Sequence, residues 1–216
     1  YLNKNNSFSY TFEKEQSGIF YFKHATERQI IFLEPNDSIM LRLNTFEFDE
    51  SLTFSGKGAR ENNFLMHMFL LNEDNSTWLL NNSNKTPKSF LKYANAMRAE
   101  QEKKLNKLLK KELFSSRFRK MASKSIDYEF YDLKERYYSL INSLHPEYVN
   151  ELPKNFFNYQ DSISFSDPSL QYYYGYLRFL DNYVKNRYYQ NCKEKSDARI
   201  NCLDFSSPQS YLTRIA

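Results

Sequence analysis

The spacing of hydrophobic residues changes at Gly56-Lys57-Gly58 and divides the chain into two kinds of structure. Before this segment, hydrophobic side chains alternate with polar ones, as in a half-buried β-strand. After it, they recur every three or four residues, as on one face of an α-helix. Because glycine adopts backbone angles that other residues avoid, Gly56 and Gly58 are predicted to form a structural hinge. We expect an α+β protein with two domains, residues 1–56 and 57–216.

The first domain is predicted to consist of short strands. Alternating, aromatic or β-branched runs that are typical of strands occur at residues 8–12, 19–22, 30–33, 39–43 and 52–54. Glu34-Pro35-Asn36-Asp37 is typical of a turn, because proline presets φ and Asn and Asp bond their own backbone. Short strands at this spacing predict a small antiparallel β-sandwich over residues 1–56.

The second domain is predicted to be all-helical. Proline is favourable at the first helical position, so helices are expected to begin at Thr86-Pro87 and at Asp167-Pro168. Another helix should end at His145-Pro146, because the residue before proline avoids helical backbone angles. Pro208 is expected to open one more helix, which Ala216 cuts short, so the helical domain is expected to be truncated at its C-terminal end.

The charges are unevenly distributed along the chain. The whole chain has 30 Lys and Arg against 26 Asp and Glu, and its net charge of +4 excludes a strongly basic nucleic-acid coat protein. Residues 98–124 contain ten basic and three acidic residues, a net charge of +7. These charges fill the helix face opposite the leucines, which favours a solvated face. The alternative is an electrostatic patch for nucleic acid or acidic lipid.

No arrangement of residues predicts a catalytic, cofactor or metal site. The three histidines, His24, His67 and His145, lie in different predicted elements and none has metal-ligand spacing. Gly56-Lys57-Gly58 lacks the Gly-x-x-x-x-Gly-Lys-Ser/Thr spacing of a phosphate loop. No run of hydrophobic residues is long enough to cross a membrane as a helix. The sequence therefore predicts no catalytic residue, cofactor, metal or transmembrane segment.

Tyrosines are concentrated near the last long helix, and two interpretations stay open. In the first, Tyr172, Tyr173, Tyr176 and Tyr189 line an aromatic groove. The chain would then be a stand-alone periplasmic or surface module that binds a glycan or a peptide. In the second, which the helical spacing favours, these side chains pack between helices or at an interface. Burial of the four side chains would exclude the groove.

The two cysteines, Cys192 and Cys202, are separated by nine residues. This spacing matches neither a C-x-x-C redox site nor a paired zinc site. In an oxidising compartment the two residues would close a small polar loop as a disulfide, and in a reducing one they would remain two thiols.

Two runs of sequence resemble a known protein family. They are Ile31–Ile39, which reads IFLEPNDSI, and Phe48–Leu65, which reads FDESLTFSGKGARENNFL. They resemble the N-terminal region of TlpA-like thiol–disulfide oxidoreductases, thioredoxin-family envelope proteins of Gram-negative bacteria. That region often reads E-P-G-D-S, then F-D-E-T and F-x-G-K-G-A-x-x-N-N-x-L, and Asn36 here replaces the turn glycine. The resemblance covers residues 7–70 well and 87–190 loosely.

The resemblance implies a function that composition and spacing do not. Family members combine a β-sandwich, a helical region and a C-terminal thioredoxin domain that carries the catalytic C-x-x-C. This chain resembles the first two parts and has no C-x-x-C. The implied function is a non-catalytic accessory region that positions the redox domain, recognises a client or partner, or mediates dimer contacts.

The resemblance also implies partners and a compartment. The expected partners are a C-terminal thioredoxin domain, an envelope client or a second copy in a homodimer. The expected location is the periplasm or cell envelope of a Gram-negative bacterium, with a lipid anchor on a removed N-terminus. Nucleic acid ranks last among the partners, because the net charge is weak and the family lies outside the cytoplasm.

Overall fold

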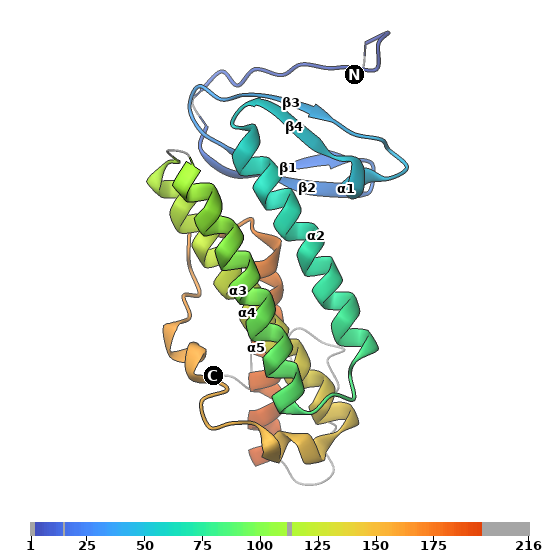
Figure 1. Ribbon diagram of the computed structural model, residues 1–216, viewed down its shortest axis with the longest axis vertical. Coiled ribbons are helices and arrows are strands. Elements are labelled where there is room, and N and C mark those ends of the chain that lie inside the picture. The colour runs from blue at the N-terminus through green and yellow to red at the C-terminus, as the bar shows by residue number, and fades with distance from the viewer. Residues whose placement is uncertain (1–2, 15, 112–113, 196–216) are drawn as a thin grey trace. The chain divides into compact units, whose positions relative to one another are not determined.

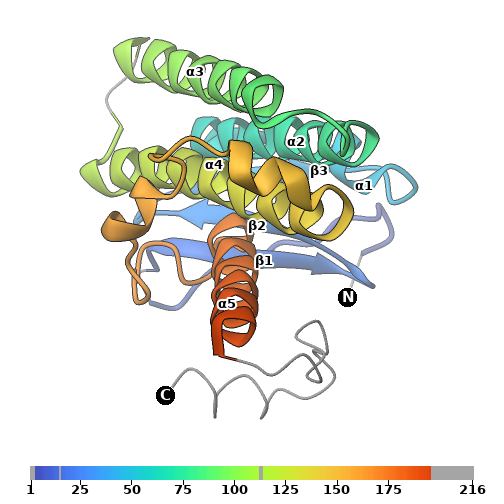
Figure 2. The same ribbon diagram turned by 90° about the horizontal axis from the view of Figure 1, so that it is seen from below.

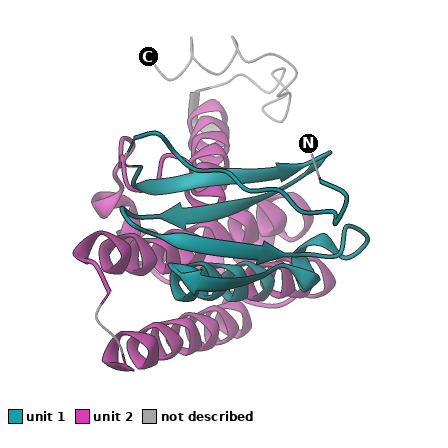
Figure 3. Ribbon diagram, turned by 90° about the horizontal axis from the view of Figure 1, so that it is seen from above, with its two compact units in different colours: residues 1–70 teal, residues 71–216 magenta. Residues whose placement is uncertain are grey.

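The computed structural model describes residues 3–14, 16–111 and 114–195. The chain divides into two compact units, residues 1–70 and 71–216, which Figure 3 colours separately. The described strands lie in the first unit and the long helices lie mainly in the second, so the predicted α+β class is confirmed. The boundary between the units falls within helix α2 (Ala59–Asn81).

The first unit contains two antiparallel sheets of two strands each (Figure 1). Strand β1 (Gly18–His24) pairs with β2 (Glu27–Leu33), and β3 (Ser38–Arg42) pairs with β4 (Thr53–Lys57). The one-turn helix α1 (Phe48–Ser51) precedes β4. The four strands overlap the predicted runs of aromatic and β-branched residues at 19–22, 30–33, 39–43 and 52–54, which fit a pleated, half-buried surface.

The predicted strand at residues 8–12 is wrong. These residues lie in no strand, and their aromatic side chains are exposed. Alternation alone does not make a strand, because the backbone N–H and C=O groups also need a neighbouring strand. The four strands that do form are two separate pairs, so the structure supports the α+β class but gives no clear β-sandwich.

The core of the first unit gathers both sheets against the first half of α2. Leu52 and Phe54 are buried together with Ala59 and Met66 of α2, and Ile31 of β2 packs against them. The predicted domains, residues 1–56 and 57–216, assign all of α2 to the helical part. Because its first half shares this core, the compact unit continues to Leu70.

The second unit is built from the rest of α2 and three long helices. These are α3 (Pro87–Lys111), α4 (Ser116–Leu144) and α5 (Tyr174–Lys195). Two short 3-10 helices, η1 (Pro146–Glu151) and η2 (Asn158–Ser162), lie in the connection between α4 and α5.

Two predicted helix boundaries in this unit are confirmed and one is corrected. Helix α3 begins at Pro87 and α4 ends one residue before His145, as predicted. Asp167-Pro168 instead forms a turn, in which Asp167 Oδ1 accepts hydrogen bonds from the backbone N and Oγ of Ser169 at 2.9 and 2.6 Å. Helix α5 begins only at Tyr174.

The contacts along the long helices show that they pack in both relative directions, and α5 crosses α4 in the view of Figure 2. Helices α3 and α4 are antiparallel, since Phe90 stacks on Tyr137 while Arg98 pairs with Asp127. Helices α4 and α5 are parallel, because their contacts advance together along both helices, from Glu129 with Arg178 to Glu135 with Asn186.

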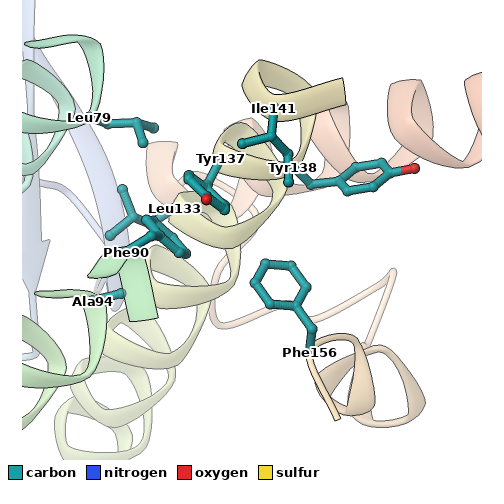
Figure 4. Close-up of a cluster of buried hydrophobic side chains, with 8 residues drawn as sticks. All are labelled: Leu79, Phe90, Ala94, Leu133, Tyr137, Tyr138, Ile141 and Phe156. Carbon is teal, nitrogen blue, oxygen red and sulfur yellow. The ribbon is translucent and has the colours of Figure 1, made fainter. Parts of the chain in front are cut away.

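Aromatic side chains fill one core of the second unit, at the end of α4 that leads into η1 (Figure 4). Phe90 and Tyr137 are stacked with ring centroids 3.8 Å apart, and Phe156 from the α4–α5 connection lies 6.5 Å from Phe90. Burial of these large rings removes much hydrophobic area from water, which stabilises the core.

Within the described ranges, no helix has both the length and the apolar character that a membrane span requires. The helix predicted to open at Pro208 lies outside the described residues.

Candidate functional site

A row of buried acidic residues on α4 is the most unusual feature of the second unit. Glu129 is 5 % exposed, and Asp132 and Glu135 are fully buried. Their spacing of three residues places them along one side of the helix, where they meet α5. Charged residues are rarely buried unless they are paired, so the partners of these carboxylates determine what the row does.

Arg178 of α5 bridges the first two carboxylates. Its Nη2 donates to Glu129 Oε2 and its Nε donates to Asp132 Oδ2, both at 2.7 Å. Arg136 of α4 also pairs with Asp132 Oδ2, at 2.9 Å. Two partly exposed guanidinium groups therefore neutralise two buried carboxylates.

Asparagines of α5 extend the contacts by one and two helical turns. Asn182 donates to Asp132 Oδ1 at 2.8 Å, and Asn186 donates to Glu135 Oε2 at 2.6 Å and to its backbone oxygen at 2.9 Å. Tyr159 donates to Glu135 Oε1 at 2.5 Å. We name this set the polar ladder: Glu129, Asp132 and Glu135 of α4 with Arg178, Asn182 and Asn186 of α5.

The ladder shifts the pKa values of its members in directions that follow from burial and charge. Burial raises the pKa of Glu129, and the opposing charge of Arg178 limits the rise. Burial alone would lower the pKa of Arg178, but the negative charges of Glu129 and Asp132 raise it. Burial and the nearby Glu129 raise the pKa of Tyr173, which donates to Glu129 Oε1 at 3.1 Å. Each ladder carboxylate has donors, so the arrangement fixes helix position rather than supplying a free acid or base.

Lys134, also on α4, is buried in a cage of aromatic rings. Its Nζ lies 5.5 Å from the ring centre of Phe130 and 4.5 Å from those of Phe156 and Tyr159. The ammonium donates to the backbone oxygen of Phe156. Burial lowers the pKa of Lys134 to about 8. This residue attaches the α4–α5 connection to α4 through cation–π contacts.

A small pocket of about 210 Å³ lies between α3 and α4. Its lining includes two carboxylates, Glu102 and Asp127. Arg98 binds both of them, at 2.9 Å and 2.5 Å. Burial raises the pKa of Asp127, and the charge of Arg98 opposes the rise. Both acidic groups of this pocket thus have Arg98 as a partner, whose single positive charge offsets one of their two negative charges.

The structure separates the four predicted groove tyrosines. Tyr173, Tyr176 and Tyr189 are 1 %, 2 % and 9 % exposed, whereas Tyr172 is 48 % exposed. Tyr176 lies edge-on to Tyr128 of α4, with ring centres 4.8 Å apart. These four residues therefore do not form an exposed aromatic groove, because Tyr173, just before α5, and Tyr176 and Tyr189, within α5, are all buried.

Gly56 and Gly58 both adopt positive φ, of 89° and 90°. A Cβ on Gly56 would lie 2.2 Å from the backbone oxygen of Ser38, and one on Gly58 would lie 2.6 Å from the carboxylate of Asp37. Both glycines thus have the unusual backbone angles that the sequence predicts. Glycine fits these positions because of its φ and because a neighbouring group lies where a Cβ would be.

Two neighbouring asparagines of α2 each form hydrogen bonds to the backbone of one strand, Asn62 to β2 and Asn63 to β4. Asn62 accepts from the backbone N of Phe32 and donates to its backbone oxygen, both at 2.8 Å. Asn63 binds Phe54 of β4 in the same way, at 3.1 and 2.8 Å. Each side-chain amide therefore completes a strand as a neighbouring strand would.

Cys192 lies in α5 and is buried. Cys202 lies outside the described residues, so the pairing of the two cysteines stays a prediction. Among the described residues, no group of three or more His, Cys, Asp or Glu side chains is placed to hold a metal ion.

Sequence reasoning missed the polar ladder. A signal was available, because Glu129 and Asp132 fall within the helical run of α4 that also carries its buried hydrophobic residues. Arg178, Asn182 and Asn186 recur every four residues on α5. Polar residues at helical spacing on a face predicted to be buried indicate a partner helix of complementary polarity.

Comparisons with protein-family models, with curated proteins and with solved structures found no match to this chain.

Proposed function

We propose that this chain is a non-catalytic accessory region of an envelope thioredoxin-like disulfide oxidoreductase. In this role the helical unit is a rigid support that positions a redox domain or presents a surface to a client. The observation that carries the proposal is the bridge from Arg178 to Glu129 and Asp132. A buried carboxylate that is fully engaged by fixed donors holds two helices in one arrangement and does not exchange protons with a substrate.

The residues behind the TlpA-like resemblance support the same proposal. Asp37, Gly58, Asn62 and Asn63 all contact backbone or turn atoms within the first unit. Their roles are structural, so what the resemblance carries over is a scaffold and not a reaction. The finer arrangement of the first unit as a β-sandwich, and the periplasmic or envelope location, rest on the resemblance and belong to the proposal.

The aromatic-groove alternative lacks support, because three of its four tyrosines are buried. We therefore do not carry it further.

A dithiol-exchange assay on the chain tests the non-catalytic part of the proposal. We expect no turnover with a disulfide-bonded protein substrate in the presence of a dithiol reductant. Turnover that disappears in a C192S variant would overturn the proposal, because it would assign redox chemistry to the chain itself. If the starting protein shows no turnover, the C192S variant should show none either, so the two proteins are assayed side by side.

The intact mass of the native gene product tests the link to a redox domain. We expect a mass that exceeds 26.0 kDa by a thioredoxin domain of about 100 residues. A mature product close to the mass of the chain would contradict the accessory role.

A further inference from the structure

Helix α3 carries a line of exposed lysines that the proposed function does not use. We name Lys103, Lys107, Lys110 and Lys111 the lysine stripe, and all four are exposed. Their spacing places them on the side of α3 away from the buried Leu105. Because a helix rises 1.5 Å per residue, the stripe extends for about 12 Å along the axis.

The stripe is not neutralised by neighbouring acidic residues. Among the residues that the structure describes, none of its four lysines forms an ion pair. Other lysines nearby do: Lys104 pairs with Glu100 at 3.1 Å, and Lys124 pairs with Asp167. The stripe therefore presents four free ammonium groups on one side of one helix.

The surroundings of the stripe favour one class of polyanion over others. Within the described part of residues 98–124, no aromatic or large hydrophobic side chain is exposed. Single-stranded nucleic acid binds through base stacking on exposed rings, and protein interfaces rely on buried aromatic or aliphatic anchors. A partner for this face has to be held by charge alone.

The shape of the stripe and the choice of lysine distinguish a lipid surface from a duplex. All four ammonium groups lie on one side of a straight helix, so a flat layer of phosphates can contact them together. Lysine acts as a flexible point charge, whereas arginine makes the planar two-pronged contacts that are common in nucleic-acid recognition. Four to eight basic residues on one helix are typical of surfaces that bind anionic lipid.

We propose that the lysine stripe docks this protein on a membrane surface of anionic phospholipid headgroups. The contact is electrostatic, between lysine Nζ atoms and lipid phosphates, with no inserted side chain. It is therefore reversible and weakens as salt screens the charges, over a Debye length of about 10 Å at 0.1 M.

Vesicle flotation with the whole chain tests the proposal. Vesicles of phosphatidylcholine alone are compared with vesicles that also contain phosphatidylglycerol. The stripe variant is K103Q/K107Q/K110Q/K111Q, and the control variant is K85Q/K88Q/K92Q/K154Q. The four control lysines are also exposed, so both variants lose the same charge. Glutamine keeps a helix propensity close to that of lysine, and circular dichroism checks that both variants fold.

We expect the starting protein and the control variant to float with the anionic vesicles at low salt and not with phosphatidylcholine alone. The stripe variant should bind about 600-fold more weakly, since each of the four lysines near an anionic surface contributes about five-fold. Absence of vesicle binding by the starting protein would overturn the proposal. So would equal weakening in both variants, which would assign binding to net charge. Tighter binding to a DNA duplex, lost in the stripe variant, would assign the stripe to nucleic acid instead.

Discussion

Asn62 of α2 binds the backbone of Phe32 on β2 through both atoms of its side-chain amide, at 2.8 Å each. The same amide nitrogen also donates to the backbone oxygen of Gly58, at 2.7 Å. Asn62 is 1 % exposed, so water cannot replace these bonds if the side chain is removed. One helical residue thus joins the end of a strand to the loop that starts α2.

The variant N62A should lower the free energy of unfolding by about 3 kcal/mol, because it removes two hydrogen bonds to the buried backbone of Phe32. N63A is the matched control. Asn63 makes the same pair of bonds to Phe54 but is exposed, so its loss should cost about 1 kcal/mol or less. Denaturant unfolding of both variants measures the difference, and equal losses would contradict the assigned role of burial.

Alanine at three glycines should destabilise in the order Gly56, Gly58, Gly18. All three have positive φ, which costs an alanine about 1 kcal/mol. At Gly56 the new Cβ also meets a backbone oxygen at 2.2 Å, at Gly58 it meets the side chain of Asp37, and at Gly18 it meets open space. Backbone cannot yield as a side chain can, so G56A should have the lowest melting temperature. A G18A variant as unstable as G56A would exclude close approach as the cause.

Replacing Arg178 with methionine should cost about 3 kcal/mol of stability, because the buried carboxylates of Glu129 and Asp132 lose the cation that they share. Neutralising the carboxylates in R178M/E129Q/D132N should recover part of that loss. Thermal or denaturant unfolding of the single and triple variants provides the measurement. If the triple variant is less stable than the starting protein by the full sum of the R178M, E129Q and D132N effects, the three residues do not act as one network.

Stability should rise with pH between about 8 and 10 because of Lys134. Its pKa is about 8 in the folded protein, whereas that of an exposed lysine is about 10.4. Between these values the unfolded chain binds more protons than the folded one, so raising the pH favours folding, by up to about 3 kcal/mol. The burial penalty of the charged form is fully present below pH 8.

The variant K134M isolates this effect, because methionine has a similar length and no charge. Unfolding free energies of both proteins at about pH 7.5 and 9.5 should show a rise in the starting protein and a smaller rise in K134M. Parallel pH profiles would show that Lys134 is not the group responsible.

Local chemistry made several elements predictable from the sequence. The start of α3 at Pro87 and the end of α4 before His145-Pro146 depend on proline, whose constraints act within a few residues. Strands β1 to β4 were predictable for a similar reason, because alternating hydrophobicity and β-branched residues both favour a strand within a few residues.

The remaining features depend on residues that are distant in sequence. Asp167-Pro168 has the local pattern of a helix start, yet the carboxylate of Asp167 binds Ser169 and Lys124 of α4, and the chain turns instead. Those bonds hold the pKa of Asp167 below its usual value, although burial alone would raise it. The burial of Tyr173 and Tyr176 likewise depends on which helix packs against α5, and a single sequence does not state that pairing.

The parallel arrangement of α4 and α5 has a consequence for how the chain folds. An antiparallel pair such as α3 and α4 can close from its turn, starting with contacts between near neighbours in sequence. The α4–α5 pair has no such end, because the ladder contacts join residues 46 to 51 positions apart. The first of these contacts to form therefore carries the entropy cost of closing a long loop, and the others then add little to that cost. We therefore expect helix α5 to dock as a whole on the other helices, so that the three buried carboxylates meet their α5 partners together and late in folding.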